Sequence, residues 1–398
     1  MRISKMASRR VRKTYLCIRV LRAVLRAVPS LLPKVRRLIF GEAIVCVFGG
    51  HGGEAFDDNS RALALYYAQA PKAKVYWISK SGQIASVNKH PNIKQLKRHS
   101  FRAEFIYNLC NLAFYSHGLS DLSTRKHTQL TWRILVHLGH GVEGFKKSVR
   151  FKVGVDDIAF DYTISGSCWQ TGWQKTRFGI ASSKIIPSGL PRFDRLIKNR
   201  KKQRTSTEVH EVLYMPTWRD WLSGRPTLQS VENHIEGIAS VVETMPETDS
   251  SGRKFKITLV VHKNSREILG DLHERISNAP KVSSKVEICL SHEVNLANII
   301  EGHSSLITDY SSVFWDFILL GKPAARFPFD EAIYDWITGA YQEAIDCTGD
   351  VTFQTPQKVW DYLSKPQHAS QHDLAEKLMG YSQGHSCKYL KDFLSKKI

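Results

Sequence analysis

Apolar runs of strand length alternate with amphipathic segments along most of the chain, and most of these runs end in a polar or glycine-rich turn. The runs are 43–48, 74–78, 133–138, 185–186, 209–214, 257–261, 286–290 and 305–307. Strands that alternate with helices favour parallel sheets, because a parallel connection needs a crossover segment. The pattern therefore predicts an α/β fold of doubly wound parallel sheets, whose ligands bind at the carboxyl ends of the strands.

The length of the chain predicts more than one domain. A chain of 398 residues is too long for one ordinary core. Its 42% hydrophobic and 24% charged residues are typical of a globular protein. We predict a basic segment at 1–40, Rossmann-like domains at 41–200 and 205–365, and terminal helices at 366–398. The basic stretch 198–204 is the expected linker between the two domains.

The net charge of +20 is concentrated near the N-terminus. Residues 1–40 hold twelve lysines and arginines and no acidic residue. At about 100° per residue, Arg12, Arg19 and Arg22 fall in one sector of a helix, and leucines and valines cover most of the other side. A basic amphipathic helix of this kind suits an anionic membrane surface. A nucleic-acid arm, a targeting peptide and a helix docked on its own protein stay open as alternatives.

Two further features bear on location. The chain has no stretch of about eighteen uncharged apolar residues, so we expect no transmembrane helix. The seven cysteines are dispersed without a CxxC pair. This distribution predicts reduced thiols in a cytosolic compartment, and neither a disulfide framework nor a zinc site.

A polar turn separates the apolar run at 305–307 from an apolar segment that ends at Leu320, before Gly321 and Pro323. This is the pattern of a strand, a turn and a helix with a glycine at its C-terminus. Free amides and the positive end of the helix dipole make such a helix start an anion site. The hydroxyls of Ser311 and Ser312 add donors for phosphate oxygens. The alternative is that one of these serines only caps the helix.

His140 lies between two glycines just after the predicted strand 133–138. An imidazole that titrates near neutral pH is the natural general base for a hydroxyl nucleophile. His137 is three residues earlier, and side chains three apart on a strand point to opposite faces. We therefore expect His137 to be a core or supporting histidine, and no metal to bind between the two.

Two other patterns are set aside on their spacing. The doublets 57–58 and 156–157 are weak metal candidates, and we expect both to be solvated turns. The loop 49–53 is glycine-rich but lacks the GxGxxG spacing of a dinucleotide site. Its glycines instead predict a tight turn or a close approach of the backbone to a ligand.

Five segments, in this order, resemble the CDP-glycerol glycerophosphotransferase family, whose enzymes prime and polymerise teichoic acids and some capsules. The segments are 48–50 with 58–63, 137–141 with 146–147, 188–194, 214–220, and 306–317 with 327–330 and Tyr334. The chain departs from the family pattern at the acceptor turn. Gly139 stands where the family has tryptophan, 142–144 replace Thr-Pro-Leu, and Phe145 is an extra residue.

The resemblance implies a GT-B-like pair of Rossmann domains with the active site in the cleft between them. The donor would be a CDP-activated polyol, in the first place CDP-glycerol. A hydroxyl of a lipid-linked or glycan acceptor attacks the β-phosphorus, and CMP leaves. The enzyme would be cytoplasmic and peripheral on the inner face of the bacterial cell membrane. No cofactor, metal or nucleic acid is expected.

The resemblance also assigns residues. It implies that His140 is the catalytic base and that His262 stabilises charge on the phosphates. The residues implied on the donor side are Ser311, Ser312, Asp309, Arg219, Thr217, Lys263, Ser188 and Gly189, and those on the acceptor side are Gly50, His51, Gly141 and Lys146. Arg219 would be a bidentate phosphate clamp.

Each assignment has a structural alternative. Arg219 could pair with Asp220 or Asp194, His262 could be a buried histidine at a strand end, and Asp309 could only brace the turn that carries the serines. Two rival functions also stay open. One is a GT-B glycosyltransferase that uses a nucleotide sugar. The other is a non-catalytic protein that binds membrane or nucleic acid through its basic segment.

Overall fold

The computed structural model describes residues 31–122, 132–142, 144–147, 159–200, 208–223, 226–279, 283–291, 293–365, 374, 377 and 379–398. The chain divides into two compact units, which are described separately. Unit 1 takes its described residues from 1–140, 149–194 and 380–398, and unit 2 from 141–148 and 195–379. The basic helix predicted before residue 30 and most of the predicted linker 198–204 lie outside the described residues.

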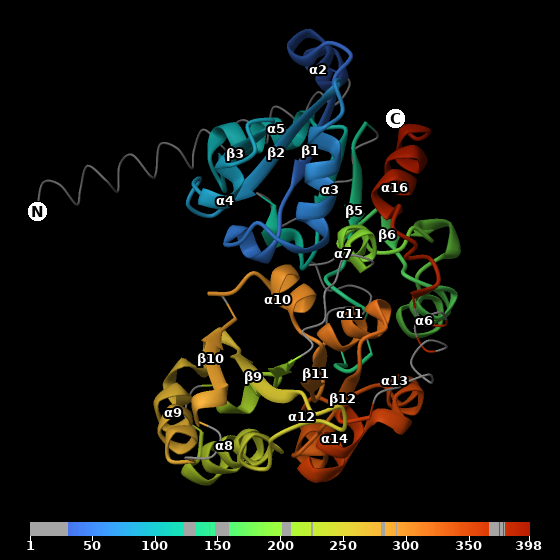
Figure 1. The fold of residues 1–398 in the computed structure, drawn as a ribbon. Helices are drawn as coiled ribbons and strands as arrows, with labels where there is room; N and C mark the ends of the chain where they lie inside the picture. The colour runs from blue at the N-terminus through green and yellow to red at the C-terminus, as the bar shows by residue number, and fades with distance from the viewer. Residues whose placement is uncertain are drawn as a thin grey trace, which may run out of the picture. The chain divides into compact units, whose positions relative to one another are not determined.

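Unit 1 is built on a parallel sheet with the strand order β3-β2-β1-β4-β5-β6-β7 (Figure 1). The strands are β1 (Ile44–Phe48), β2 (Ala73–Ser79), β3 (Ile93–Lys97), β4 (Leu112–Tyr115), β5 (Ile134–His137), β6 (Tyr162–Ile164) and β7 (Ile185–Ile186). The central strands β1 and β4 are almost entirely buried, as expected for strands covered on both faces.

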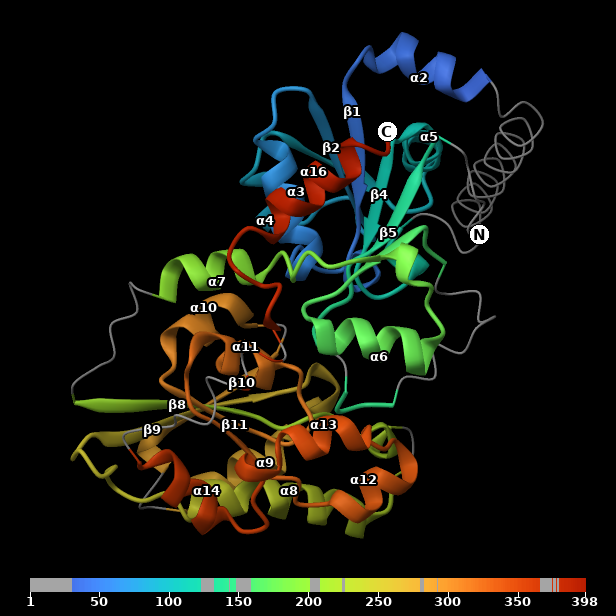
Figure 2. The ribbon, with the colours of Figure 1, turned by 90° about the vertical axis from the view of Figure 1, so that its right-hand side faces the viewer.

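Helices cover both faces of this sheet. They are α2 (Leu32–Phe40), α3 (Asp58–Ala68), α4 (Ala85–Asn88), α5 (Phe101–Leu109), α6 (Cys168–Phe178) and α16 (Ser386–Ser395). α7 (Phe193–Arg200) begins in unit 1, and its residues from Arg195 on belong to unit 2. α5 packs its Ala103, Ile106 and Tyr107 on one face, against Val45 and Val47 of β1. The C-terminal α16 lies beside α3 (Figure 2), so the end of the chain is part of unit 1.

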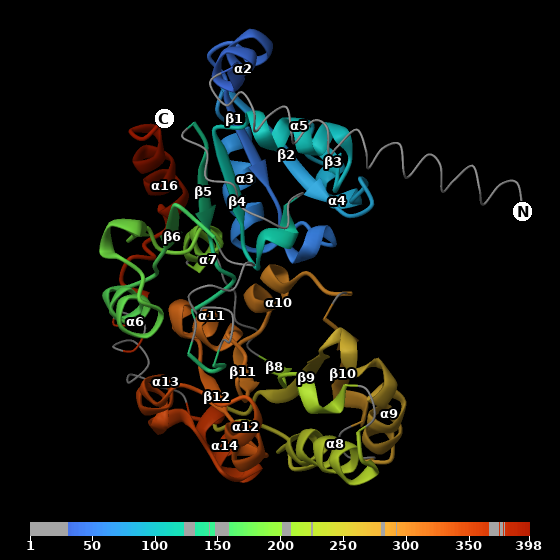
Figure 3. The same cartoon turned by 180° about the vertical axis from the view of Figure 1, so that it is seen from behind.

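Unit 2 repeats the plan with the parallel strand order β10-β9-β8-β11-β12. The strands are β8 (Val209–Met215), β9 (Lys254–Val261), β10 (Val286–Leu290), β11 (Ser305–Thr308) and β12 (Ala324–Arg326). The helices are α8 (Leu228–Glu243), α9 (Leu269–Ser277), α10 (Leu296–Gly302), α11 (Val313–Leu320), α12 (Glu331–Ile337), α13 (Gln342–Cys347) and α14 (Pro356–Leu363). α8, α9 and α14 share one apolar core over the sheet, and α10 and α11 lie on its other face (Figures 2 and 3).

These two sheets confirm the predicted α/β fold with parallel strands. In sequence order, the first five strands of each unit are arranged 3-2-1-4-5, so the direction of winding reverses between β1 and β4 and between β8 and β11. Ligands of doubly wound sheets bind at the carboxyl ends of the strands at such a reversal. Each unit therefore offers one preferred position for a site.

Within the described residues, none of the helices combines the length and the apolar character that a membrane span requires.

Candidate active site

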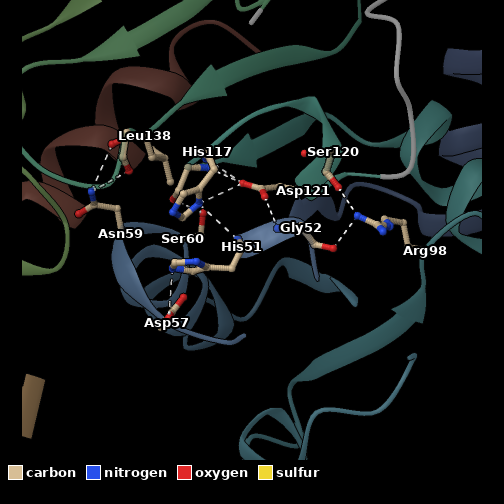
Figure 4. Close-up of polar contacts among 12 residues, drawn as sticks. His51, Gly52, Asp57, Asn59, Ser60, Arg98, His117, Ser120, Asp121 and Leu138 are labelled. Atoms are coloured by element: carbon tan, nitrogen blue, oxygen red, sulfur yellow. Dashed lines mark hydrogen bonds and ion pairs between the residues drawn. The ribbon is translucent and has the colours of Figure 1, made fainter. Parts of the chain in front are cut away.

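Three histidines meet at the carboxyl ends of β1, β4 and β5 in unit 1. His51 lies in the turn after β1, His117 follows β4, and His140 follows β5. The ring centroids of His51 and His117 are 3.9 Å apart, and the rings of His117 and His140 are stacked at 4.7 Å with planes 13° apart. Figure 4 shows His51 and His117 with their polar contacts. His117 thus brings together two predicted site residues, and the sequence analysis did not find it.

The turn that carries His140 is held by polar contacts from two other segments. Nδ2 of Asn59, at the start of α3, donates to the carbonyl oxygens of Leu138 and Gly139, at 3.2 and 3.0 Å. Nη1 of Arg192 donates to the carbonyl oxygen of His140 at 2.6 Å. The amide of Arg192 donates in turn to Oδ1 of Asn59 at 3.1 Å. Three of the sequence segments that carry the family resemblance therefore converge on one turn.

The surroundings of His140 favour its neutral form. The residue is exposed, and its ring is desolvated on the side that stacks on His117. This desolvation, together with the nearby His117 and Arg192, lowers the pKa of His140 well below its ordinary value. The buried His137, whose Nδ1 lies 3.2 Å from Oγ1 of Thr163, has its pKa lowered to about 4 by burial. His137 is thus a neutral core histidine, and His140 is a neutral imidazole at the surface.

Asp121 organises the turns around His117. Its carboxylate accepts hydrogen bonds from the amides of Gly52, Ser116 and His117, at 2.7, 3.1 and 2.8 Å. Its Oδ2 also lies 3.6 Å from Nδ1 of His117. Burial would raise the pKa of Asp121, but the bonds from His117 outweigh burial and lower that pKa to about 2. Burial likewise acts to lower the pKa of His117, and the carboxylate of Asp121 reverses this and raises it.

Three other predicted residues of unit 1 have packing contacts. Gly50 is buried and extended, with the ring of Trp77 beside it. Oγ of Ser188 donates to the carbonyl oxygen of Gly189 at 2.8 Å. Gly189 has φ +77°, and a Cβ there would lie 2.6 Å from the carbonyl oxygen of Tyr381. The segment around Gly189 therefore packs closely against the C-terminal segment. The donor role of Ser188 and Gly189 stays a prediction.

The second set of predicted residues lies at the ends of β8, β9 and β11 in unit 2. Oδ1 of Asp309, just after β11, accepts from the amide of Thr217 at 2.8 Å and from that of Tyr310 at 2.6 Å. Asp309 is buried, and burial would raise its pKa, but the charge of Arg219 and these amide bonds lower it. Asp309 therefore braces the serine turn as a carboxylate.

Arg219 is fully buried and engaged on every side. Its Nε and Nη2 contact the two oxygens of Asp330 at 2.7 and 2.6 Å, Nη2 also lies 2.6 Å from Oδ2 of Asp309, and Nη1 donates to the carbonyl oxygen of Thr217. The structure thus favours the alternative that Arg219 forms ion pairs within the protein, although its partners are Asp309 and Asp330 and not Asp220 or Asp194. The clamp role of Arg219 stays a prediction.

Polar groups that a ligand could bind lie at the start of α11. Oγ of Ser311 accepts from the amide of Val313 at 3.3 Å, and the half-buried Ser312 is the N-cap residue without a side-chain capping bond. Within the described part of the chain, the buried atoms Oγ1 of Thr217 and Nε1 of Trp218 have no hydrogen-bond partner. Such groups are costly unless a ligand satisfies them. The turn therefore combines a helix N-terminus with hydroxyl and N–H groups suited to an anionic ligand.

His262 follows β9 beside this turn. Its ring is stacked with that of Trp218 at 6.3 Å, and its Nδ1 accepts from the amide of Asn264 at 3.2 Å. The side chain of Lys263 lies outside the described residues.

The segment 144–147, which follows His140 closely in the chain, is anchored within unit 2. The ring of Phe145 is stacked on that of Trp315 at 4.8 Å, and Oη of Tyr334 donates to the carbonyl oxygen of Phe145. Lys146 is exposed and pairs with Asp220 at 3.1 Å. Gly141 is buried. The residue that is extra relative to the family pattern, Phe145, is thus the anchor of this segment.

Comparison with known protein families shows the family of this chain. Residues 35–393 match the sequence profile of the family described as CDP-glycerol:poly(glycerophosphate) glycerophosphotransferase. The chain belongs to this family. The match covers all of the histidine turns of unit 1 and the serine turn of unit 2.

Curated members of the glycerophosphotransferase family align with parts of the chain. A teichoic acid poly(glycerol phosphate) polymerase of Staphylococcus epidermidis is 25% identical over 60% of this chain and 33% of its own length. A teichoic acid glycerol-phosphate primase of Bacillus subtilis is 23% identical over 60% of this chain and 58% of its own length. A teichoic acid glycerol-phosphate transferase of Staphylococcus aureus is 22% identical over 74% and 77% of the two lengths. The chain thus spans less than two thirds of the length of the first two relatives.

Solved structures agree on the fold. The wall teichoic acid polymerase TagF superposes with a TM-score of 0.63 at 18% identity, covering 97% of both chains. A UDP-GlcNAc 2-epimerase from Neisseria meningitidis superposes with a TM-score of 0.53 at 13% identity, covering 89% of this chain and all of that one. At these identities the likeness concerns the fold alone, and it supports the predicted GT-B-like architecture.

Proposed function

We propose that this chain transfers glycerol phosphate from CDP-glycerol to a hydroxyl group of a cell-wall polymer or lipid-linked acceptor and releases CMP. The observation that carries the proposal is the family match over residues 35–393. The named activities of the curated relatives, which prime or polymerise poly(glycerol phosphate), agree with it.

In the proposed reaction the acceptor oxygen attacks the phosphorus that carries the glycerol. A new P–O bond forms, the bond from that phosphorus to the bridging oxygen breaks, and this oxygen leaves as part of CMP. The acceptor proton passes to a neutral imidazole, for which His140 is the candidate. Support comes from its surface position and from the contacts of Asn59 and Arg192, which fix the turn. Positioned bases contribute about 10²–10⁴-fold to such reactions.

The donor phosphates would bind at the start of α11. The helix N-terminus, the hydroxyls of Ser311 and Ser312, and Oγ1 of Thr217 supply the donors, and Asp309 keeps the turn in shape. His262 lies beside this turn, where an imidazole can stabilise charge on a phosphate. Phosphoryl transfer relies on positioning and charge neutralisation of this kind.

The N-terminal part of the chain would hold the enzyme on the cytoplasmic face of an anionic membrane. α2 carries Lys34, Arg36 and Arg37, and it exposes 88% of Leu38 and 49% of Ile39. Basic and apolar side chains side by side are the features of an interfacial helix. Deletion of residues 1–40 is expected to abolish binding to anionic vesicles and to leave transfer to a soluble acceptor intact. Vesicle binding that survives the deletion would contradict this assignment.

The donor is tested by incubating the purified full chain and an acceptor with CDP-glycerol, CDP-ribitol and a panel of nucleotide sugars. We expect CMP release with CDP-glycerol and formation of a phosphodiester. Release of a nucleoside diphosphate from a nucleotide sugar, with a glycosidic bond formed, would identify a glycosyltransferase and overturn the proposal.

A further inference from the structure

The histidine turns of unit 1 contain a set of metal-ligating groups that the proposed reaction does not use. Among the described residues, His51, Asp58 and His117 each have a potential ligand atom within 4.8 Å of the others. His51 comes from the turn after β1, Asp58 from the start of α3 and His117 from the turn after β4. The set therefore lies at the reversal between β1 and β4, which is the preferred ligand position of this sheet.

The charges around this set favour a cation. Asp57 and Asp121 lie beside it, with Oδ2 of Asp57 at 3.3 Å from Nε2 of His51 and Oδ2 of Asp121 at 3.6 Å from Nδ1 of His117 (Figure 4). An anion would face the carboxylates of Asp58 and Asp121 here, and the carboxyl of Asp57, whose pKa is raised to about 7 by burial and by Asp58. Arg192 offsets only part of this charge, through its 3.1 Å contact with Oδ1 of Asp58.

One of these carboxylates, that of Asp57, is placed as the outer partner of a metal-bound histidine would be. A histidine that binds a metal through one ring nitrogen usually has its other nitrogen bonded to a carboxylate or carbonyl, which orients the ring. Asp57 stands in this relation to His51, whereas Nδ1 of His117 accepts a 3.3 Å hydrogen bond from the amide of His51 and lies 3.6 Å from Asp121. Oδ1 of Asp57 is buried and has no hydrogen-bond partner among the described residues, so the site contains an unsatisfied acceptor.

Two of the three residues have an unusual backbone conformation. His51 and Asp58 have φ values of 46° and 58°, in the left-handed region that side chains other than glycine rarely adopt. Strained residues of this kind concentrate at functional sites. A cation bonded at about 2 Å to each atom needs the three groups closer together. The three atoms lie within 4.8 Å of one another, so binding requires a small movement of these side chains.

We propose that His51, Asp58 and His117 bind a divalent transition-metal ion, such as Zn²⁺, Mn²⁺ or Co²⁺. Two imidazoles and one carboxylate are ligands that these ions share. Three protein ligands leave a coordination position for water or a substrate oxygen. The contact of Arg192 occupies one oxygen of Asp58, and a carboxylate has further lone pairs for a cation. The proposal departs from the expectation from sequence that no metal binds, and it does not depend on the proposed activity.

The proposal is tested on the full chain after removal of metal with a chelator. Zn²⁺ is titrated by calorimetry, and Co²⁺ by its visible absorption, which reports the ligands. We expect one equivalent of each ion to bind. His51→Gln and Asp58→Asn should each weaken binding by at least about tenfold, since even outer carboxylates typically contribute 10–100-fold to metal affinity.

His90→Gln is the matched control, because His90 lies in unit 1 outside the set and should leave binding unchanged. His51 is exposed, so His51→Gln should keep the fold even if Asp58→Asn disturbs the contact with Arg192. Absence of saturable binding by the wild type would overturn the proposal. Equal affinity of the wild type and His51→Gln, or binding that is lost when the cysteines are blocked, would overturn it as well.

Discussion

The amide of Thr217 donates a 2.8 Å hydrogen bond to Oδ1 of Asp309, which ties the end of β8 to the end of β11. The same carboxylate contacts Arg219, and Arg219 contacts Asp330. A buried charge network therefore shapes the turn that carries Ser311 and Ser312. The conformation of the proposed phosphate site depends on residues that do not themselves need to touch the donor.

Replacing Arg219 tests this dependence. Arg219→Leu leaves Asp309 without its charged partner, and breaking a buried pair in this way typically costs about 3–5 kcal/mol. We expect the free energy of unfolding, measured with urea, to fall by that amount. Arg275→Leu is the control, because its pair with Glu243 is exposed and should contribute less than about 1 kcal/mol. Equal losses in the two variants would contradict a bracing role.

Gly189→Ala tests whether the close packing at Gly189 holds the C-terminal segment in place. The new Cβ would lie 2.6 Å from Oγ of Ser386 and from the carbonyl oxygen of Tyr381, so the segment must shift. We expect faster hydrogen exchange in α16 and earlier proteolysis near residue 381. Gly179→Ala is the control: Gly179 has a similar φ of +65° but nothing within 4 Å of its Cβ position. Unchanged exchange in α16 of the Gly189 variant would show that the contact does not hold the segment.

Asp249 should make unit 2 sensitive to acid. Burial would raise the pKa of Asp249, but hydrogen bonds from His210 and Ser251 lower it below its usual range. The unfolded chain then binds more protons in acid, so this contribution is present above about pH 4 and is lost as the pH falls toward the folded pKa. Asp249→Asn should weaken the loss of stability between pH 4 and pH 2, as measured by urea unfolding.

At pH 7 the same variant should be about 1–3 kcal/mol less stable, because it removes a buried charged acceptor. Asp271→Asn, at an exposed position of α9, serves as the control. If wild type and Asp249→Asn lose the same stability between pH 4 and pH 2, Asp249 is not the source of that loss.

Phe145→Ala should weaken the anchor of the segment that follows the His140 turn. Phe145 is 3% exposed, stacked on Trp315 and edge-on to Phe314, and Arg326 lies 4.4 Å from its ring centroid. Loss of a buried phenylalanine typically costs about 3–5 kcal/mol. Urea unfolding followed by tryptophan fluorescence measures this loss. Phe101→Ala, at a ring that is 47% exposed, should cost much less; a similar cost for both would mean that Phe145 is not an anchor.

The parts of the fold that were predictable are those with strong local signals. The buried strands β1, β8 and β9 each contain an apolar run of three to five residues, and the helix expected to end at Leu320 is α11, with Gly321 in the left-handed conformation. The strands that were missed have weak signals. β4 and β12 have four and three residues, and β3 alternates with exposed lysines.

Weak local signals also explain which residues of the candidate site were not predicted from the sequence. His140 follows a recognisable strand, whereas His117 follows β4, whose short run Leu-Ala-Phe-Tyr was not recognised. The Ser-His-Gly that ends this run was the available signal. The pairing of Arg219 with Asp330 joins residues 111 positions apart, and no local pattern contains such a contact.

The central claim is tested most directly by phosphodiester formation from CDP-glycerol, followed by ³¹P NMR and CMP release with the full chain and an acceptor. We predict that His140→Ala lowers the rate by about 10²–10⁴-fold while donor binding survives. His90→Ala, at a histidine of the same unit that packs on Phe56 and not on His140, should retain the wild-type rate. Transfer by His140→Ala at more than about a tenth of the wild-type rate would contradict the account.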